Sequence, residues 1–148
     1  MWTQRGSAMN RRVHMGWVLA GVLVVSAACR REAAFGRSSL PFGSVDLPAP
    51  KATVRGTFQI AGWVLADQPI QEVSVYIDGK YLTATSTKMP RPDVALAKPG
   101  YKDARDCGFT LLVETSAYSA GWHEIVVQAR AEDGATRDLA TVPVFVQR

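Results

Sequence analysis

From residue 57 to the end of the chain, hydrophobic and polar positions alternate in short runs separated by turn residues. Alternation with a period of two is typical of β-strands that bury one face. The runs cover residues 57–65, 72–78, 80–87, 109–114, 122–131 and 138–146. Asp78-Gly79 and Asp133-Gly134 each stand between two runs and predict hairpin turns, because a type I′ turn needs positive φ at both central residues.

Six or seven short strands with no helical period predict an antiparallel β-sandwich of about 100 residues, placed at 51–148. Residues 80–87 are polar and rich in threonine, which is typical of a strand at the edge of a sheet. Residues 29–50 show no sustained period and predict a flexible linker that is semi-extended near Pro48 and Pro50.

The first 28 residues have the order of a secretory signal peptide. Arg5, Arg11 and Arg12 precede an uncharged run of 15 residues from Met15 to Cys29. A positive segment followed by an apolar one and by small residues is the pattern of a cleaved signal. A spanning helix needs about 20 apolar residues, so this run is short for a membrane span.

The end of this run, Ser26-Ala27-Ala28-Cys29, resembles the lipobox of bacterial lipoprotein signal peptides. The resemblance implies that Cys29 is acylated and becomes the first residue of the mature protein, although a leucine usually stands where Ser26 does. Ordinary signal cleavage and an uncleaved short anchor are the alternatives. Arg30 stands where an inner-membrane retention signal would have an aspartate, so an outer membrane is favoured where the cell has two.

Cys29 and Cys107 are the two cysteines of the chain. An acylated Cys29 leaves Cys107 without an intrachain partner, buried or free. The lesser alternative is a disulfide between them in an oxidising compartment.

The net charge of +4 comes mostly from the leader. From Cys29 onward the chain has 14 Lys and Arg against 13 Asp and Glu. A nucleic-acid-binding domain carries a clear basic excess on one face. The composition therefore excludes nucleic acid as the expected partner.

Residues 51–148 resemble the immunoglobulin-like domains of bacterial secreted and surface proteins. The ordered segments that carry the resemblance are VRGTFQIAGWVLA at 54–66, VSVYIDG at 73–79, RPDV at 91–94, GF at 108–109 and GWHEIVVQA at 121–129. The resemblance implies a non-catalytic immunoglobulin-like sandwich that serves as a spacer, an adhesion module or a carbohydrate-adjacent module. It implies no cofactor and no conserved chemistry.

The long loop over residues 89–109 crosses from one predicted sheet to the other. The resemblance places Arg91 and Asp93 at a recurring position with a structural role, and we expect both side chains to face inward. Gly108 and Phe109 are expected to re-enter the core. A ligand-binding role for the loop remains the alternative, since binding residues gather on loops.

Calcium is a second alternative for this loop, through Asp93, Asp103 and Asp106. Ca²⁺ takes six to eight oxygen ligands, usually from a regularly spaced acidic loop that this chain lacks. Lys102 and Arg105 stand among the acids. We therefore expect a solvated or salt-bridged loop and no metal site.

The exposed aromatic side chains are the candidate ligand-binding residues. Trp122 and Tyr76 fall on the outward phases of their strands, and Tyr101 lies in the long loop, whereas Trp63 is expected in the core. His123 is in phase with buried residues and predicts a core or rim histidine, because a catalytic one needs a nucleophile and an orienting group.

These features together predict a cell-envelope lipoprotein that presents a non-catalytic interaction or spacer module at a membrane surface. Its expected partners are the membrane, through the lipid, and a protein or glycan. One alternative is a carbohydrate-binding module that uses the exposed aromatics and residues 88–107, and another is an accessory domain of a secreted enzyme.

Overall fold

The computed structural model describes residues 40–148. Residues 1–39, which hold the predicted signal peptide, Cys29 and the first half of the predicted linker, lie outside the described part. The strands are β1 (Phe42–Leu47), β2 (Ala52–Val54), β3 (Thr57–Leu65), β4 (Ile70–Ile77), β5 (Lys80–Thr85), β6 (Gly108–Glu114), β7 (Gly121–Ala131) and β8 (Thr136–Val146). The helical segments are α1 (Pro92–Ala97) and the 3₁₀ turns η1 (Ala104–Asp106) and η2 (Thr115–Ala117).

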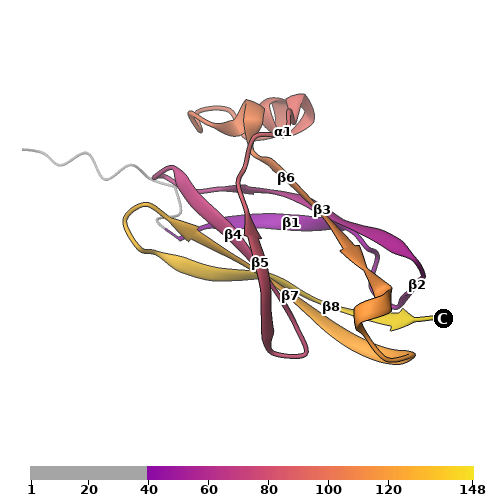
Figure 1. The fold of residues 1–148 in the computed structure, drawn as a ribbon. Coiled ribbons are helices and arrows are strands. Elements are labelled where there is room, and N and C mark those ends of the chain that lie inside the picture. Colours follow the sequence, from indigo (N-terminus) through magenta and orange to yellow (C-terminus); the bar gives the residue numbers. More distant parts are fainter. Residues whose placement is uncertain (1–39) are drawn as a thin grey trace, which may run out of the picture. The chain divides into compact units, whose positions relative to one another are not determined.

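The strands form two sheets packed face to face, which confirms the predicted β-sandwich (Figure 1). One sheet has the order β1-β3-β6 and the other β2-β8-β7-β4-β5. β2 pairs with β8 in parallel, and the other pairs are antiparallel. The core between the sheets is mostly β-branched and includes Ile60, Val75, Ile125 and Val127, all buried. β-Branched side chains pack well on a pleated surface.

The hairpin predicted at Asp78-Gly79 joins β4 to β5, with φ of 51° at Asp78 and 74° at Gly79. Both central residues thus have the positive φ that a type I′ turn requires. β5 is an edge strand, as its polar sequence predicted.

The domain boundary predicted at residue 51 is wrong. β1 lies inside the predicted linker and pairs with β3 along Phe42 to Leu47. Gly43 allows this pairing, because a Cβ built there would lie 2.0 Å from the Trp63 carbonyl oxygen. The sandwich therefore begins with β1, at Phe42.

The long loop is partly helical, although the sequence shows no helical period. It crosses from β5 to β6, and so from one sheet to the other, as expected. α1 and η1 lie against the outer face of the three-stranded sheet (Figure 1). There Val94, Ala104 and Cys107 bury Leu65 in a second small core. We call residues 89–107 the cap.

The two ends of the described chain lie at opposite ends of the sandwich (Figure 1). Leu40 leads into β1 beside the end of β3, where Phe42 pairs with Leu65. Arg148 follows the end of β8, where Val146 pairs with Gly121. We call these the proximal end and the distal end.

Candidate functional site

The outer face of the five-stranded sheet exposes aromatic rings. Ile125, Val127 and Ala129 of β7 face the core, so Trp122 points outward by the alternation of the strand. Trp122 is 61% exposed, and its ring meets the edge of Phe145, the cross-strand partner on β8, at 5.5 Å between centroids.

A second aromatic pair lies on the same face. Tyr76 of β4 pairs with Val126 of β7 on one side and with Tyr81 of β5 on the other. The two tyrosine rings are 5.7 Å apart, and Tyr81 is 60% exposed. Val126 is four residues from Trp122, which is about 13 Å along a strand. We call Tyr76, Tyr81, Trp122 and Phe145 the aromatic face.

Polar side chains accompany these rings. Glu124 is exposed between Trp122 and Val126 on β7, and Gln128 donates a hydrogen bond of 2.7 Å from Nε2 to Asp138 Oδ1. Aromatic rings beside polar groups suit a ligand that has both apolar and hydroxylated surface.

Tyr101 does not join this face. It lies in the cap, where its ring packs against Phe42 at 5.2 Å between centroids. The structure therefore brings together two of the three predicted ligand-binding residues, Tyr76 and Trp122, and places the third at the other end of the domain.

Trp63 was expected in the core between the sheets, and this prediction is wrong. Its neighbour Val64 points into that core, so Trp63 points to the outer face and packs beside Phe42 under the cap. The prediction failed because the cap gives the outer face of this sheet its own apolar cluster.

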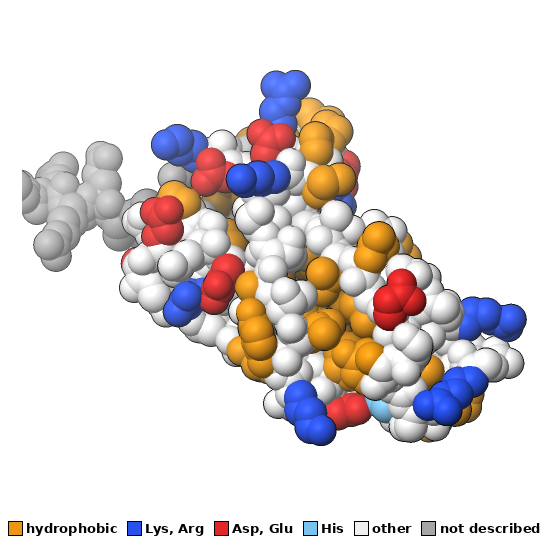
Figure 2. All heavy atoms as spheres, in the orientation of Figure 1, with side chains coloured by type: hydrophobic (Ala, Val, Ile, Leu, Met, Phe, Trp, Pro, Cys, Tyr) orange, Lys and Arg blue, Asp and Glu red, His pale blue; other side chains and the backbone are white. Residues whose placement is uncertain are grey.

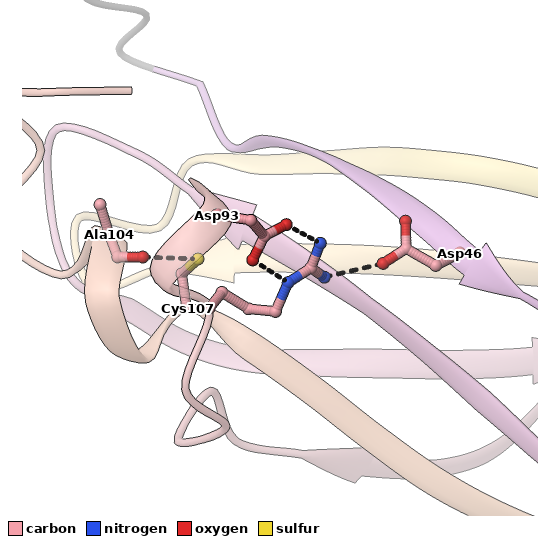
Figure 3. A network of polar contacts seen from close by, with 5 residues as sticks. Asp46, Asp93, Ala104 and Cys107 are labelled. Atoms are coloured by element: carbon pink, nitrogen blue, oxygen red, sulfur yellow. Dashed lines mark hydrogen bonds and ion pairs between the residues drawn. The ribbon is translucent and has the colours of Figure 1, made fainter. Parts of the chain in front are cut away.

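Arg91 connects the cap to β1. Its Nε and Nη2 atoms donate to the two carboxylate oxygens of Asp93 at 2.9 and 2.8 Å, and Nη1 donates to Asp46 at 2.7 Å (Figure 3). The hydrogen bonds from Arg91 lower the pKa of Asp93 to about 2. The Arg91 side chain is 23% exposed and the Asp93 side chain 63%. The expected inward orientation therefore holds in large part for Arg91 and is wrong for Asp93.

Both carboxylate oxygens of Asp93 are engaged by Arg91, which makes Asp93 a poor calcium ligand. Within residues 40–148, no group of three or more acidic, histidine or cysteine side chains is placed to hold a metal ion.

The end of the cap returns the chain to the core. Phe109 is buried between the sheets, as expected, and Gly108 passes close to the start of the cap. A Cβ at Gly108 would lie 2.8 Å from the Met89 carbonyl oxygen. Cys107 is a buried free thiol that donates to the Ala104 carbonyl at 3.1 Å, and its burial raises the pKa of the thiol.

His123 lies at the distal rim and joins two loops. Its Nδ1 is 2.6 Å from Asp78 Oδ2, and its Nε2 is 2.9 Å from the Ser119 carbonyl oxygen. The backbone N–H of Glu124 donates to the other Asp78 oxygen at 2.9 Å. Both ring nitrogens thus face acceptors, so the protonated imidazolium fits the site. The hydrogen bond to Asp78 is the main cause of the raised pKa of His123.

This pair predicts a pH-dependent stability. The folded pKa of His123 is raised above 6.5, so its contribution is complete below pH 6.5 and is lost as the pH rises through the folded value. The folded pKa of Asp78 is lowered, mainly by the Glu124 N–H, so its contribution is lost as the pH falls below 3.8. Urea unfolding at pH 5.5 should give about 1 kcal/mol more stability than at pH 8.5, which is less than a buried charged hydrogen bond contributes because the Asp78 side chain is 46% exposed to solvent.

His123→Gln is the matched variant for this measurement, because glutamine keeps a donor but does not titrate. Its stability should be the same at the two pH values after correction for the remaining groups. An equal pH difference in both proteins would assign the dependence to other side chains.

Tyr81 was not identified from the sequence as part of the aromatic face, nor was Asp78 identified as the partner of His123. The two-residue turn at Asp78-Gly79 places Tyr76 opposite Tyr81, so Tyr81 could have been found by counting from the turn. Asp78 was assigned only to the turn, although a short side chain there also lies beside the start of β7.

Comparisons with known proteins show the fold. No family model matches the chain, and no curated protein sequence matches it. The endo-beta-1,4-mannanase from Thermotoga petrophila has a TM-score of 0.52 at 13% identity, over 76% of this chain and 20% of the mannanase. The fibronectin(III)-like modules of Clostridium thermocellum CbhA have a TM-score of 0.50 at 16% identity, over 70% of this chain and 93% of the module.

The chain thus spans about a fifth of the length of the mannanase but nearly all of the fibronectin(III)-like module. At these identities the likeness shows the fold alone, an immunoglobulin- or fibronectin-like β-sandwich. Within residues 40–148, no helix is long and apolar enough to cross a membrane.

Proposed function

We propose that this protein is a cell-envelope lipoprotein whose β-sandwich is a non-catalytic interaction or spacer module at a membrane surface. The observation that carries the proposal is the placement of the two chain ends at opposite ends of the domain (Figure 1). Ten residues separate Cys29 from Leu40, a reach of about 40 Å when fully extended. A lipid on Cys29 would hold the proximal end nearest the bilayer and leave the distal end outward.

The exposed groups at the distal end support an interaction role. Trp122 is at the start of β7, next to the end of β8, and so projects where a tethered domain is most accessible. The likeness to a fibronectin(III)-like module is consistent with a domain that serves to space or to bind. The outer membrane is the proposed location where the cell has two membranes.

Cys29→Ala is the test of the anchor. The wild-type chain should partition with membranes and incorporate a radiolabelled fatty acid, and the variant should lose both. A wild-type-like membrane fraction of Cys29→Ala with unchanged mass would contradict lipidation. Cys107→Ala is the matched control, and it should leave labelling unchanged because that thiol is buried.

A second candidate function is carbohydrate binding, which the two ring pairs of the aromatic face favour. The mannanase, of which about a fifth matches this domain, is by its name an enzyme that acts on a polysaccharide. The cap lies on the outer face of the other sheet, so residues 88–107 do not contribute to the same surface as Trp122. A role as accessory domain of a secreted enzyme would use the same aromatic face.

Trp122→Ala tests the carbohydrate function. On a glycan array, the wild-type domain should bind some glycans and Trp122→Ala should lose that binding at least tenfold, as expected when an exposed aromatic anchor is removed. Leu96→Ala, an exposed apolar change on the cap, is the control that should bind like wild type. An array without hits for the wild type would remove this candidate.

A further inference from the structure

The open side of the sandwich lies between two edge strands. β6 ends the three-stranded sheet and β5 ends the five-stranded sheet. A hollow of about 190 Å³ opens between them, lined by Leu82, Leu112, Val113, Ala117 and Tyr118 among others. A hollow of about 300 Å³ adjoins it and shares Leu82, Ala117 and Tyr118. Figure 2 shows hydrophobic side chains gathered in a band between these strands.

The hydrogen bonds at the two ends of β6 show which of its backbone groups face this side. The Gly108 N–H donates to the Met89 carbonyl, and the Gly108 carbonyl accepts from the Met89 N–H. Both groups of Gly108 therefore point away from β3. At the two ends of β6, the hydrogen bonds of the odd-numbered residues point toward β3. The Cys107 carbonyl accepts from the Val64 N–H, and the Thr115 N–H donates to the Gly56 carbonyl. Because these directions alternate along a strand, Leu112 and Glu114 point their N–H and carbonyl groups at the open side.

Glu114 is the one charged side chain on this part of β6, and three other common protections of an edge are missing from it. Free edges are normally blunted by proline, lysine or a β-bulge. β5 has both a bulge at Leu82 and Lys80 at its start. β6 pairs with β3 in unbroken register, and Leu112 exposes 68% of its surface. Of these two edge strands, β6 is therefore the one that is open to pairing with a further strand.

The occupant must bring a strand whose side chains are free to enter the hollow. A second copy of β6 cannot do this, because its Val113 is buried in its own core and its Leu111 packs against that core. The charge on the free run of β6 is Glu114, exposed on the same face as Leu112. An opposite charge in the cross-strand position would be favourable.

We propose that the free edge of β6, at Leu112 and Glu114, binds an extended strand of a partner protein. The strand has apolar side chains at alternate positions that fill the hollow beside Leu82 and Tyr118, and a basic side chain opposite Glu114. Backbone hydrogen bonds supply affinity and the hollow supplies specificity, as in other strand additions. The inference rests on the proposed role as an interaction module and names the kind of partner.

Synthetic octapeptides test this, with valine at alternate positions and either lysine or glutamate at both ends. The full chain in detergent should bind the lysine peptides and should bind the glutamate peptides about tenfold more weakly. Glu114→Gln should reduce that preference to near unity. Amide hydrogen exchange should slow at Leu112 and Glu114 when peptide is added and stay unchanged at Leu111, which faces β3.

Leu112→Pro is the decisive variant. Proline removes the N–H that faces the open side, and an edge strand tolerates it there because the ladder to β3 is not touched. Binding should fall at least tenfold in Leu112→Pro and stay within about threefold of wild type in Leu112→Ala, which keeps the N–H. If Leu112→Pro does not fold, the Glu114→Gln and hydrogen-exchange results decide.

The proposal is overturned if no octapeptide binds, if Leu112→Pro binds as well as wild type, or if exchange slows elsewhere. Dimers of the wild-type chain that Leu112→Pro abolishes would assign the edge to a second copy instead. Loss of membrane partition in Cys29→Ala is measured separately, so failure of strand addition and failure of the anchor are distinguishable.

Discussion

A fragment of residues 51–148 is expected not to fold, whereas a fragment of residues 40–148 is expected to melt cooperatively. The shorter fragment lacks β1, one of the three strands of the smaller sheet. Its loss removes the β1 partners of β3 at five positions, from Ala61 to Leu65, and makes β3 an edge strand. It also removes Val45 from the main core and Phe42 from the cluster beneath the cap.

These losses are comparable with the whole stability of a small domain, about 5–15 kcal/mol. Arg91 would also lose Asp46, so the cap would keep only its local pair with Asp93. Circular dichroism melting and two-dimensional amide spectra of both fragments measure the effect. A cooperative transition in the shorter fragment within a few degrees of the longer one would show that β1 is dispensable.

The strands from residue 57 onward could be predicted because the alternation of buried and exposed positions is local to each strand. The same alternation placed Tyr76 and Trp122 outward. β1 was missed because its sequence, FGSVDL, lies among prolines and contains Gly43. That glycine is explained by the close approach to Trp63, which is not visible from the sequence.

The cap was missed for a different reason. α1 has six residues, fewer than two turns, so no helical period can be read from it. Arg91 and Asp93 are two positions apart and could be paired from sequence, but Asp46 comes from a strand 45 residues away. Likewise, Phe145 reaches Trp122 through a β7–β8 register that a bulge after Val127 shifts.

Phe109→Ala is expected to destabilise the domain by about 3–5 kcal/mol, the range for a phenylalanine removed from a packed core. Phe109 is among the largest fully buried side chains and lies where the chain leaves the cap and enters β6. Its ring also fills the space over Gly62, where a Cβ would lie 2.8 Å from Cζ. The free energy of unfolding from urea titration measures the effect.

Leu112→Ala, three residues along the same strand, is the matched control and is expected to change stability by no more than about 0.5 kcal/mol. The two variants differ in burial but share a strand, so strand propensity is closely matched. A cost for Leu112→Ala as large as that for Phe109→Ala would place Leu112 in the core. A small cost means that folding does not require a leucine side chain at this exposed edge position, so Leu112→Ala leaves the fold and the outward N–H of the strand in place for the binding measurements.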